Sequence, residues 1–295
     1  MNQPKTERRV HMLAREASAW PVVGPATLQL RAAARLLRRR PPGAAVTAAL
    51  DERVVFVLGS PRSGTTFLAG ALGSLPGFVD LGEVLPLKAA VPTLARLGPE
   101  QAAIRVRRML WLTRRLSGLG GVRAVEQTPE AAFLGRALPL AFPDATILHL
   151  VRDGRDVVAS LLERGWLSTK STGRDDAGNV VGAAPRFWVE AGREEEFAAA
   201  SEARRAAWAW RRYVEGGRGL GASATEMRYE RICRDPEGAA GELAALLEAP
   251  EHELQRALRG ARAGSIGRFR GELTPAQLAD VEVEAGELLV VLGYE

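Results

Sequence analysis

A compact apolar run that leads into a glycine-rich loop and then a helical pattern most constrains the fold of this chain. The stretch reads VVFVLGSPRSGTTFLAGAL over residues 54–72. Residues 53–59 predict a buried strand because they are rich in β-branched side chains, and residues 64–75 predict a helix with one apolar face. The loop glycines have the G-x-x-x-x-G spacing of loops that hold phosphate groups at a helix N-terminus. The sequence therefore predicts an anion site between this strand and this helix.

One position separates the loop from those that bind nucleoside triphosphates. Thr65 stands where such loops carry the lysine that contacts the β- and γ-phosphates. Arg62 brings a positive charge from a different point of the loop instead. The N–H groups of Ser63, Gly64, Thr65 and Thr66 are expected to point at one anion, with the helix dipole adding to the attraction.

Strand and helix patterns alternate along most of the chain, which predicts an α/β fold with a central parallel sheet and helices on both faces. Further strands are expected at 121–127, 145–151 and 223–229, and further helices at 130–142, 153–165 and 236–249. Right-handed crossovers would connect the strands. Ligands of such sheets lie beyond the carboxyl ends of the strands, so the site is expected at that edge.

The segment ILHLVRDGRDVVASLL suggests a second anion site. Arg152 ends the strand and Ser160 follows eight residues later in the next helix, so both side chains can face one phosphate. Asp153 is expected to cap this helix and Asp156 to lie on its surface, rather than to bind a metal. The alternative is that Asp153, Arg155 and Asp156 form a capping network without any ligand.

Four segments carry a resemblance to a known family. GSPRSGTTFL resembles the 5′-phosphosulfate loop of sulfotransferases that use 3′-phosphoadenosine-5′-phosphosulfate (PAPS), and its Arg-Ser-Gly-Thr-Thr form is similar to that of bacterial and tyrosylprotein members. VRDGRDVVAS resembles the family's 3′-phosphate segment. MRYERICRDPEG resembles its R-Y-E-D-L-x-x-D-P segment, with Arg231 in place of Asp, and GSIGRFRGE resembles its S-x-G-R-W-R segment, with Phe269 in place of Trp. Together the segments cover most of 53–294.

The resemblance implies a three-layer P-loop-like fold and a role for most of the candidate residues. PAPS would be the co-substrate and adenosine 3′,5′-bisphosphate the product, with no metal ion. The residues implied to bind the nucleotide are Arg62, Ser63, Gly64, Thr65, Thr66, Arg152, Ser160, Gly267 and Arg268. Arg62 would also stabilise the transition state, and Arg270 is an alternative to Arg268 for contact with a phosphate.

A general base must remove the proton of the acceptor hydroxyl, and Glu83 is our candidate. It follows the loop helix in GFVDLGEVLPLK, where a short strand is expected to return to the same edge of the sheet, and the resemblance places a base at its G-E position. His149 is the rival on chemistry, but its apolar neighbours favour a core histidine. Glu126 is a second carboxylate expected near the edge.

One departure from the family concerns the segment usually written E-K-T-P. Here Gln127 replaces the lysine, which in relatives often contacts the sulfuryl group or the acceptor. The lost charge implies lower activity, a different acceptor, or compensation by Lys88 or Arg123.

Composition bounds the remaining classes of function. The charge of +5 comes almost entirely from arginine, which reflects either an anionic ligand or genomic base composition. A single cysteine, Cys233, excludes an intrachain disulfide, and three scattered histidines argue against zinc. The basic residues are spread out without interleaved aromatics, so no nucleic-acid partner is expected. Because we find neither a membrane-length apolar run nor a secretory signal, we expect the cytoplasm.

The chain is expected to form one sulfotransferase-like domain at 46–295 after an N-terminal extension at 1–45. The extension contains a basic helix at 27–43, which packs on the domain or, as the alternative, lies on an anionic membrane surface. An insertion at about 166–215 is expected to form the acceptor wall, with most of its aromatic side chains in the core. Within it, residues 194–214 predict one long helix. Small-molecule, glycan and lipid hydroxyls all remain open as acceptors, and so does the oligomeric state.

Two other functions remain as alternatives. The first is a P-loop kinase or NTPase, for which Asp80 is the only weak magnesium candidate. The second is a catalytically silent protein that binds adenosine 3′,5′-bisphosphate, which the loss of the lysine at position 127 suggests.

Overall fold

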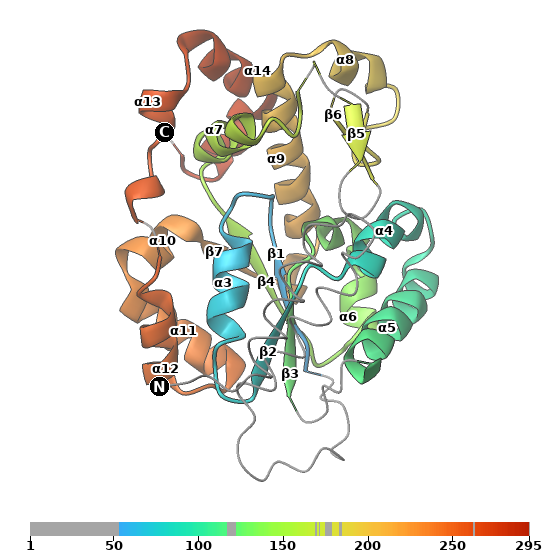
Figure 1. Cartoon of the computed structure of the whole chain (residues 1–295), viewed down its shortest axis with the longest axis vertical. Coiled ribbons are helices and arrows are strands. Elements are labelled where there is room, and N and C mark those ends of the chain that lie inside the picture. The colour runs from blue at the N-terminus through green and yellow to red at the C-terminus, as the bar shows by residue number, and fades with distance from the viewer. Residues whose placement is uncertain are drawn as a thin grey trace, which may run out of the picture.

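A five-stranded parallel sheet organises the protein, with strand order β2-β3-β1-β4-β7 (Figure 1). The computed structural model describes residues 53–116, 122–168, 170, 172–174, 179–182, 185–261 and 263–294. The strands are β1 (Val55–Leu58), β2 (Phe78–Gly82), β3 (Arg123–Glu126), β4 (Thr146–Val151) and β7 (Thr225–Arg228). Every neighbouring pair is parallel, which confirms the predicted class of sheet. The predicted extension at 1–45, with its basic helix, lies outside the described residues.

Helices cover both faces of the sheet, so the protein has the three layers that the resemblance implied. One face carries α3 (Thr65–Leu72), α11 (Pro236–Leu247) and α12 (Glu251–Leu258). The other carries α4 (Leu85–Leu94), α5 (Pro99–Leu116), a 3₁₀ turn η1 (Pro129–Leu134) and α6 (Ala137–Ala141). The side chains of strand β1 show why both faces are covered, because successive side chains point to opposite faces of the sheet. Val55 and Val57 pack into the first layer, while Phe56 and Leu58 pack into the second.

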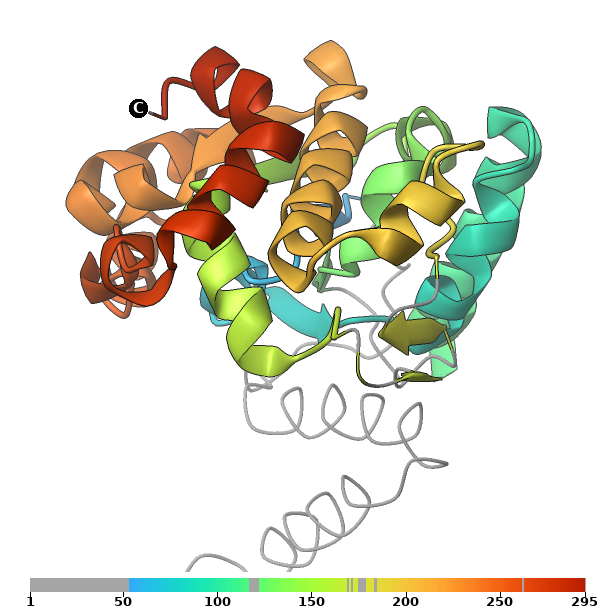
Figure 2. The same cartoon turned by 90° about the horizontal axis from the view of Figure 1, so that it is seen from above.

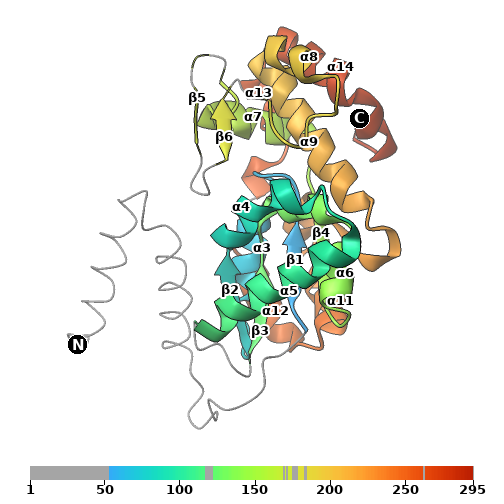
Figure 3. The ribbon, with the colours of Figure 1, turned by 90° about the vertical axis from the view of Figure 1, so that its right-hand side faces the viewer.

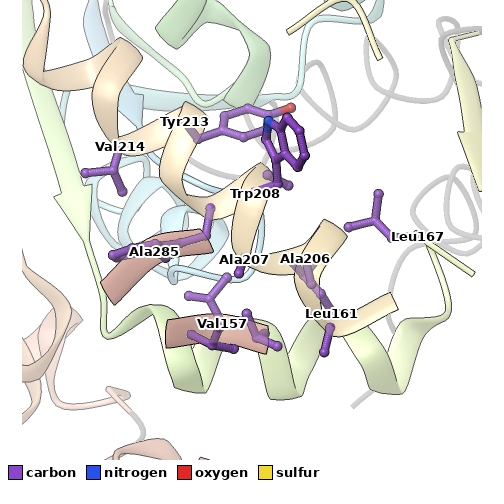
Figure 4. Packing of buried hydrophobic residues seen from close by; sticks show 14 of the residues in the cluster. Val157, Leu161, Leu167, Ala206, Ala207, Trp208, Tyr213, Val214 and Ala285 are labelled. Carbon is purple, nitrogen blue, oxygen red and sulfur yellow. The ribbon is translucent and has the colours of Figure 1, made fainter. Parts of the chain in front are cut away.

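A second group of helices lies beyond one end of the sheet and has its own core. It consists of α7 (Gly154–Arg164), α8 (Glu194–Ala199), α9 (Glu202–Arg218), α13 (Phe269–Glu272) and α14 (Pro275–Val291). Figure 4 shows Val157 and Leu161 of α7 packed with Ala206 and Trp208 of α9 and with Ala285 of α14. These contacts lock α7, which follows strand β4, against the C-terminal helix (Figure 2).

The segment 166–215 contributes both to this core and to the surface. Trp208 and Trp210 are fully buried, as expected for most of its aromatic side chains, whereas Trp166 is 45% exposed. An antiparallel pair, β5 (Thr172–Arg174) with β6 (Val180–Gly182), occupies a stretch for which no strand was predicted. This pair lies at the end of the molecule that carries α7, α8 and α9 (Figure 3).

Two predicted helices are each divided in two by a local backbone feature. The helix expected at 130–142 is η1 followed by α6, because Gly135 adopts a φ of 50° that an α-helix does not allow. The single long helix expected from Glu194 onward is α8 and α9. Between them Ala200 and Ser201 are extended, and the Ser201 hydroxyl accepts from the Arg204 N–H as the cap of α9.

The carboxyl ends of all five parallel strands lie at one edge of the sheet. A polar or loop residue directly follows each strand there. Gly59 follows β1, Glu83 follows β2, Gln127 follows β3, Arg152 follows β4 and Tyr229 follows β7. The sequence-predicted site residues therefore converge at the carboxyl edge, where parallel α/β sheets bind ligands. Within the described ranges, every helix is too short or too polar to span a bilayer.

Candidate functional site

The loop between β1 and α3 presents a helix N-terminus to the carboxyl edge. Gly64 occupies the cap position of α3, and no side chain caps this helix. The first N–H groups of an α-helix have no acceptor within the helix, so those of Thr65 and Thr66 are directed out of it. The Ser63 N–H is the exception, because it donates to Ser60 O over 3.0 Å and closes the loop as a turn. Of the N–H groups expected to point at one anion, that of Ser63 is therefore already engaged by the loop itself.

Two residues of this loop have left-handed backbones. Gly64 has a φ of 96°, and a β-carbon there would lie 2.6 Å from the ring of Tyr229. Arg62 has a φ of 73°, which is unfavourable for a residue with a side chain. Backbone strain of this kind persists where the surrounding structure imposes it and is concentrated at ligand sites. Here it turns the Arg62 side chain toward α7.

Arg62 and the two predicted 3′-phosphate residues form one connected group. The Arg62 Nε donates to Ser160 Oγ over 2.9 Å, and an Arg152 Nη donates to the Arg62 carbonyl over 3.1 Å. Arg152 is only 5% exposed and its guanidinium lies 4.8 Å from the centre of the Tyr229 ring. The structure therefore brings together three residues predicted for two ends of one ligand.

The electrostatics of this group favour an anion. The pKa of Arg62 lies below its ordinary value because burial removes water from the guanidinium, and because Arg164, Arg152 and Arg268 repel its charge. Glu163 offsets part of this repulsion. Arg62, Arg152, Arg164 and Arg268 thus bring positive charge to one region of the site, and an anionic ligand would offset part of it.

Two buried polar atoms of the group have no hydrogen-bond partner among the described residues, namely Ser63 Oγ and Arg152 Nε. Ser63 is fully buried. Buried hydroxyl and guanidinium groups rarely remain unsatisfied in folded proteins, and each such group calls for an explanation. A bound phosphate or sulfate would supply acceptors for both.

A segment near the C-terminus closes one side of the site. Asp156 accepts hydrogen bonds from the backbone N–H groups of Gly267 and Phe269, over 2.8 and 3.1 Å. Arg152 also donates to the Ser265 carbonyl, and Tyr229 OH shares a 3.1 Å hydrogen bond with Ser265 Oγ. Gly267 therefore lies beside the predicted nucleotide residues.

The expectation that Asp156 lies on the surface is wrong, since its side chain is fully buried beneath that segment. Asp153 does cap α7, as predicted, by accepting from the Arg155 N–H. Phe269, at the position where the family has Trp, lies 4.3 Å from the Arg155 guanidinium. Asp153 and Asp156 therefore both accept hydrogen bonds from backbone N–H groups of the protein.

Arg268 lies at the rim of the site. Its guanidinium makes ion pairs with Glu272 at 2.7 Å and Glu163 at 3.1 Å. It is nevertheless close enough to lower the pKa of Arg62. To contact a nucleotide, this side chain would exchange a carboxylate partner for a phosphate.

Glu83, the candidate base, is ion-paired rather than isolated. Its Oε2 lies 2.7 Å from Nζ of Lys88, which is in the first turn of α4. The Glu83 side chain is 29% exposed and that of Lys88 is 11% exposed. Glu83 therefore lies at the edge of the sheet with access to solvent, and sequence reasoning did not anticipate its pairing with Lys88.

Gln127 contacts the beginning of α3 and the end of β2. Thr66 Oγ1 donates to Gln127 Oε1 over 3.3 Å, and the Gln127 N–H donates to Gly82 O over 3.2 Å. Position 127 thus bridges α3 and the end of β2. An uncharged side chain therefore lies beside Thr66.

Glu126 has a structural position at this edge of the sheet, because its carboxylate is buried away from any acceptor substrate. It is fully buried, and its Oε1 accepts from both the N–H and the hydroxyl of Thr128. Thr128 Oγ1 in turn accepts from the N–H of Val84, next to Glu83, over 3.0 Å. Burial raises the pKa of Glu126 to about 7, against the opposing effect of the Thr128 hydrogen bonds.

The other candidates lie away from the anion group. His149 is 1% exposed within β4, with Nδ1 3.6 Å from Glu226. Arg123 is buried at the opposite end of β3 and donates to the carbonyls of Arg53 and Leu247, so it is not placed to replace the missing lysine. Asp80 accepts from the Gly82 N–H over 2.7 Å. Among the described residues, no cluster of three or more His, Cys, Asp or Glu residues is suited to a metal ion.

Tyr229 is a partner of the site that was not among the predicted site residues. It immediately follows the last residue of β7, and this position at the carboxyl edge was the available signal. Ser265 belongs to the segment that resembles the family's S-x-G-R-W-R segment, but only the folded chain shows its contact with Arg152.

Comparison with known proteins bears on the family and on the fold. A model of the sulfotransferase family matches residues 99–253, more than half of the chain. A sulfotransferase domain from the curacin biosynthetic pathway has 15% identity and a TM-score of 0.53, with 84% of this chain and 99% of that chain covered. Sulfotransferase STF1 from Mycobacterium tuberculosis H37Rv has 17% identity and a TM-score of 0.50, with 90% and 83% covered. No curated protein matches the chain in sequence.

The two solved structures establish the fold alone, at these low identities. The family rests on the sequence model, whose match includes the ends of β3, β4 and β7. The chain belongs to the sulfotransferase family.

Proposed function

We propose that this protein transfers the sulfuryl group of PAPS to a hydroxyl of a small-molecule, glycan or lipid acceptor. The observation that carries the proposal is the contact of Arg62 with Ser160 and Arg152. This contact joins the loop suited to the 5′-phosphosulfate with the residues suited to the 3′-phosphate. A ligand with anionic groups at both ends of one adenosine fits such a joined site.

The residues present fit the phosphate groups of this co-substrate. An uncapped helix N-terminus, a buried Ser63 hydroxyl and the buried Nε of Arg152 all offer donors, and the surrounding arginines favour negative charge. When bound, PAPS supplies the activated sulfuryl group. Ser63, Gly64, Thr65, Thr66 and Arg62 would hold its 5′ end. Arg152, Ser160, Gly267 and Arg268 would hold its 3′ end.

Different residues of the chain would then stabilise the leaving group and remove the proton of the acceptor. Negative charge grows on the bridging oxygen of the leaving nucleotide, and the Arg62 guanidinium with the loop N–H groups would stabilise it. The Glu83 carboxylate would take the proton of the attacking hydroxyl. Glu126 and Thr128 would hold the backbone beside Glu83 in place, through the Val84 N–H.

We propose that the insertion at 166–215 forms the acceptor wall together with η1. Phe133 of η1 makes edge-on contacts with Phe187 and Tyr213, at centroid distances of 5.2 and 4.8 Å. The Tyr213 hydroxyl donates to Glu130 over 3.3 Å, and burial raises the pKa of this tyrosine well above its ordinary value. Tyr213 thus remains a neutral donor, and the aromatic group offers an apolar surface to the acceptor.

A second candidate function has one observation in its favour. Gln127 contacts Thr66 of the loop without bringing a charge, which suits a protein that binds adenosine 3′,5′-bisphosphate and does not turn over. A kinase or NTPase is disfavoured, because Asp80 is engaged by the Gly82 N–H and Thr65 replaces the phosphate-binding lysine.

The test is incubation of the protein with ³⁵S-labelled PAPS and a panel of hydroxylated metabolites, glycans and lipid extracts. We expect transfer of label to at least one acceptor, and loss of transfer in Glu83→Gln with adenosine 3′,5′-bisphosphate affinity unchanged within about twofold. Tight binding of this product without transfer to any acceptor would favour the silent protein. Magnesium-dependent ATP turnover would favour the kinase.

A further inference from the structure

Lys88 is a largely buried cation whose ammonium meets the candidate base. The residue is 9% exposed, and its Nζ lies 2.7 Å from Glu83 Oε2. A short, mostly buried contact between opposite charges is stronger and more directional than one on the surface. The spacing of five residues is not that of neighbours on one helix face, so the turn from β2 into α4 creates this pair.

The pair is linked to the phosphate loop through backbone and side-chain contacts. Thr66 donates to Gln127, and the Gln127 N–H donates to Gly82 O, one residue before Glu83. Position 127 therefore lies between the loop and the Glu83–Lys88 pair.

The arginines near the carboxyl edge contact other groups than Glu83. Arg62 and Arg152 lie on the side of the edge that faces α7, where they contact Ser160 and Ser265. Arg123, the second residue considered for compensation, is at the far end of β3. Among the described residues considered for compensation, Lys88 alone is placed beside Glu83.

We infer that Lys88 is a positioning residue for sulfuryl transfer, which holds the Glu83 carboxylate toward the acceptor. The inference rests on the proposed function. In the reaction, the acceptor oxygen forms a bond to sulfur while the bond from sulfur to the nucleotide's bridging oxygen breaks. The nucleotide leaves with that electron pair, and the hydroxyl proton passes to Glu83. Lys88 keeps its protons throughout and acts only through Glu83.

The pair itself is tested without any nucleotide. The chain has three lysines, Lys5, Lys88 and Lys170, so ¹⁵N-lysine labelling gives a spectrum that is simple to assign. An ammonium held in a buried ion pair exchanges protons slowly with water. We expect a protected ammonium signal that disappears in Lys88→Met and broadens in Glu83→Gln. A Lys88 signal with unchanged shift and width in Glu83→Gln would overturn the inference.

The catalytic consequence is tested on turnover of ³⁵S-labelled PAPS with an acceptor found by the panel. Lys88→Met should lower kcat about 10- to 100-fold, the cost of a displaced catalytic group, with KM for PAPS changed less than about twofold. Lys88→Arg should recover most of the rate. Arg53→Met, which removes the cation of an exposed pair with Glu248 before β1, is the matched control and should keep the wild-type rate.

A double-mutant cycle separates positioning from general support of the fold. In the Glu83→Gln background, Lys88→Met should lower the residual rate by less than about twofold, because its partner is already gone. Independent losses that multiply would show that Lys88 acts elsewhere and would overturn the inference. If the panel yields no acceptor, the proposed function fails while the ammonium spectrum still decides whether the pair exists. If the wild type turns over and Lys88→Met keeps its kcat, the inference alone fails.

Discussion

The guanidinium of Arg62 and the hydroxyl of Ser160 touch, at 2.9 Å, although 98 residues separate them in the chain. One belongs to the loop after β1 and the other to the helix after β4, which are adjacent strands of the sheet. We therefore propose that the two anion sites predicted from separate motifs form one continuous site. Such a site would make binding at one end sensitive to changes at the other.

Ser160→Ala should weaken binding of adenosine 3′,5′-bisphosphate about 10-fold and lower the transfer rate as well. The substitution removes a hydrogen bond to a charged group, which contributes about 1.5–3 kcal/mol, and it releases the Arg62 side chain. Ser74→Ala is the matched control, since its hydroxyl donates to the helix carbonyl of Ala71, at the far end of α3 from the loop. Calorimetric titration of both variants measures the difference, and equal affinities would remove Ser160 from the site.

Gly64→Ala should destabilise the protein by about 2 kcal/mol or more, because the new methyl group meets the Tyr229 ring and the backbone has a φ of 96°. Gly70→Ala in the same helix is the control. There a β-carbon meets nothing within 4 Å, so a gain of about 0.5–1 kcal/mol is expected. Chemical unfolding of the two variants gives both values. A neutral Gly64→Ala would mean that the loop is not held as described.

Glu126→Gln should change how stability depends on pH. Burial raises the pKa of Glu126 from 4.5 to about 7, so the folded protein binds a proton that the unfolded chain releases. Wild-type stability should therefore fall between pH 4.5 and about 7, by roughly 3 kcal/mol at most, and stay level above that range. The variant lacks the titrating group, so its unfolding free energy relative to wild type should rise over the same interval. A difference that is flat from pH 5 to 8 would contradict the shift.

Asp156→Asn should loosen the segment that closes the site. The carboxylate accepts from two backbone N–H groups, whereas an amide offers one acceptor oxygen and turns an NH₂ group toward the other donor. We expect a loss of about 1–3 kcal/mol and faster hydrogen exchange at Gly267 and Phe269. Asp144→Asn, at an exposed residue, should leave both exchange rates unchanged.

Those parts of the fold whose sequence pattern lies within one short stretch of the chain could be predicted. The apolar run of β1, the glycine loop and α3 follow one another without interruption, and β4 with its Asp153 cap does the same for α7. Even so, the helices that Gly135 and Ser201 interrupt were predicted as continuous. Gly135 in the first case, and Ala200 with Ser201 in the second, have non-helical backbone angles that interrupt an otherwise helical pattern.

The contacts that define the site join distant segments, and no local pattern reports them. Asp156 was expected on the surface because its partner Gly267 lies 111 residues further along the chain. The Glu83–Lys88 pair was missed for a different reason, since it depends on the angle between β2 and α4. The positions of candidate residues after each strand were predictable, whereas their pairing required the folded chain.

The most direct test of the joined site compares two ligands on two proteins by calorimetry. Adenosine 3′,5′-bisphosphate and adenosine 5′-monophosphate are each titrated into wild type and into Arg152→Ala. The account predicts that the bisphosphate binds wild type more tightly than the monophosphate, and that Arg152→Ala weakens the bisphosphate about 10- to 100-fold and the monophosphate by less than about threefold. Equal losses for the two ligands, or no binding of the bisphosphate to wild type, would contradict it.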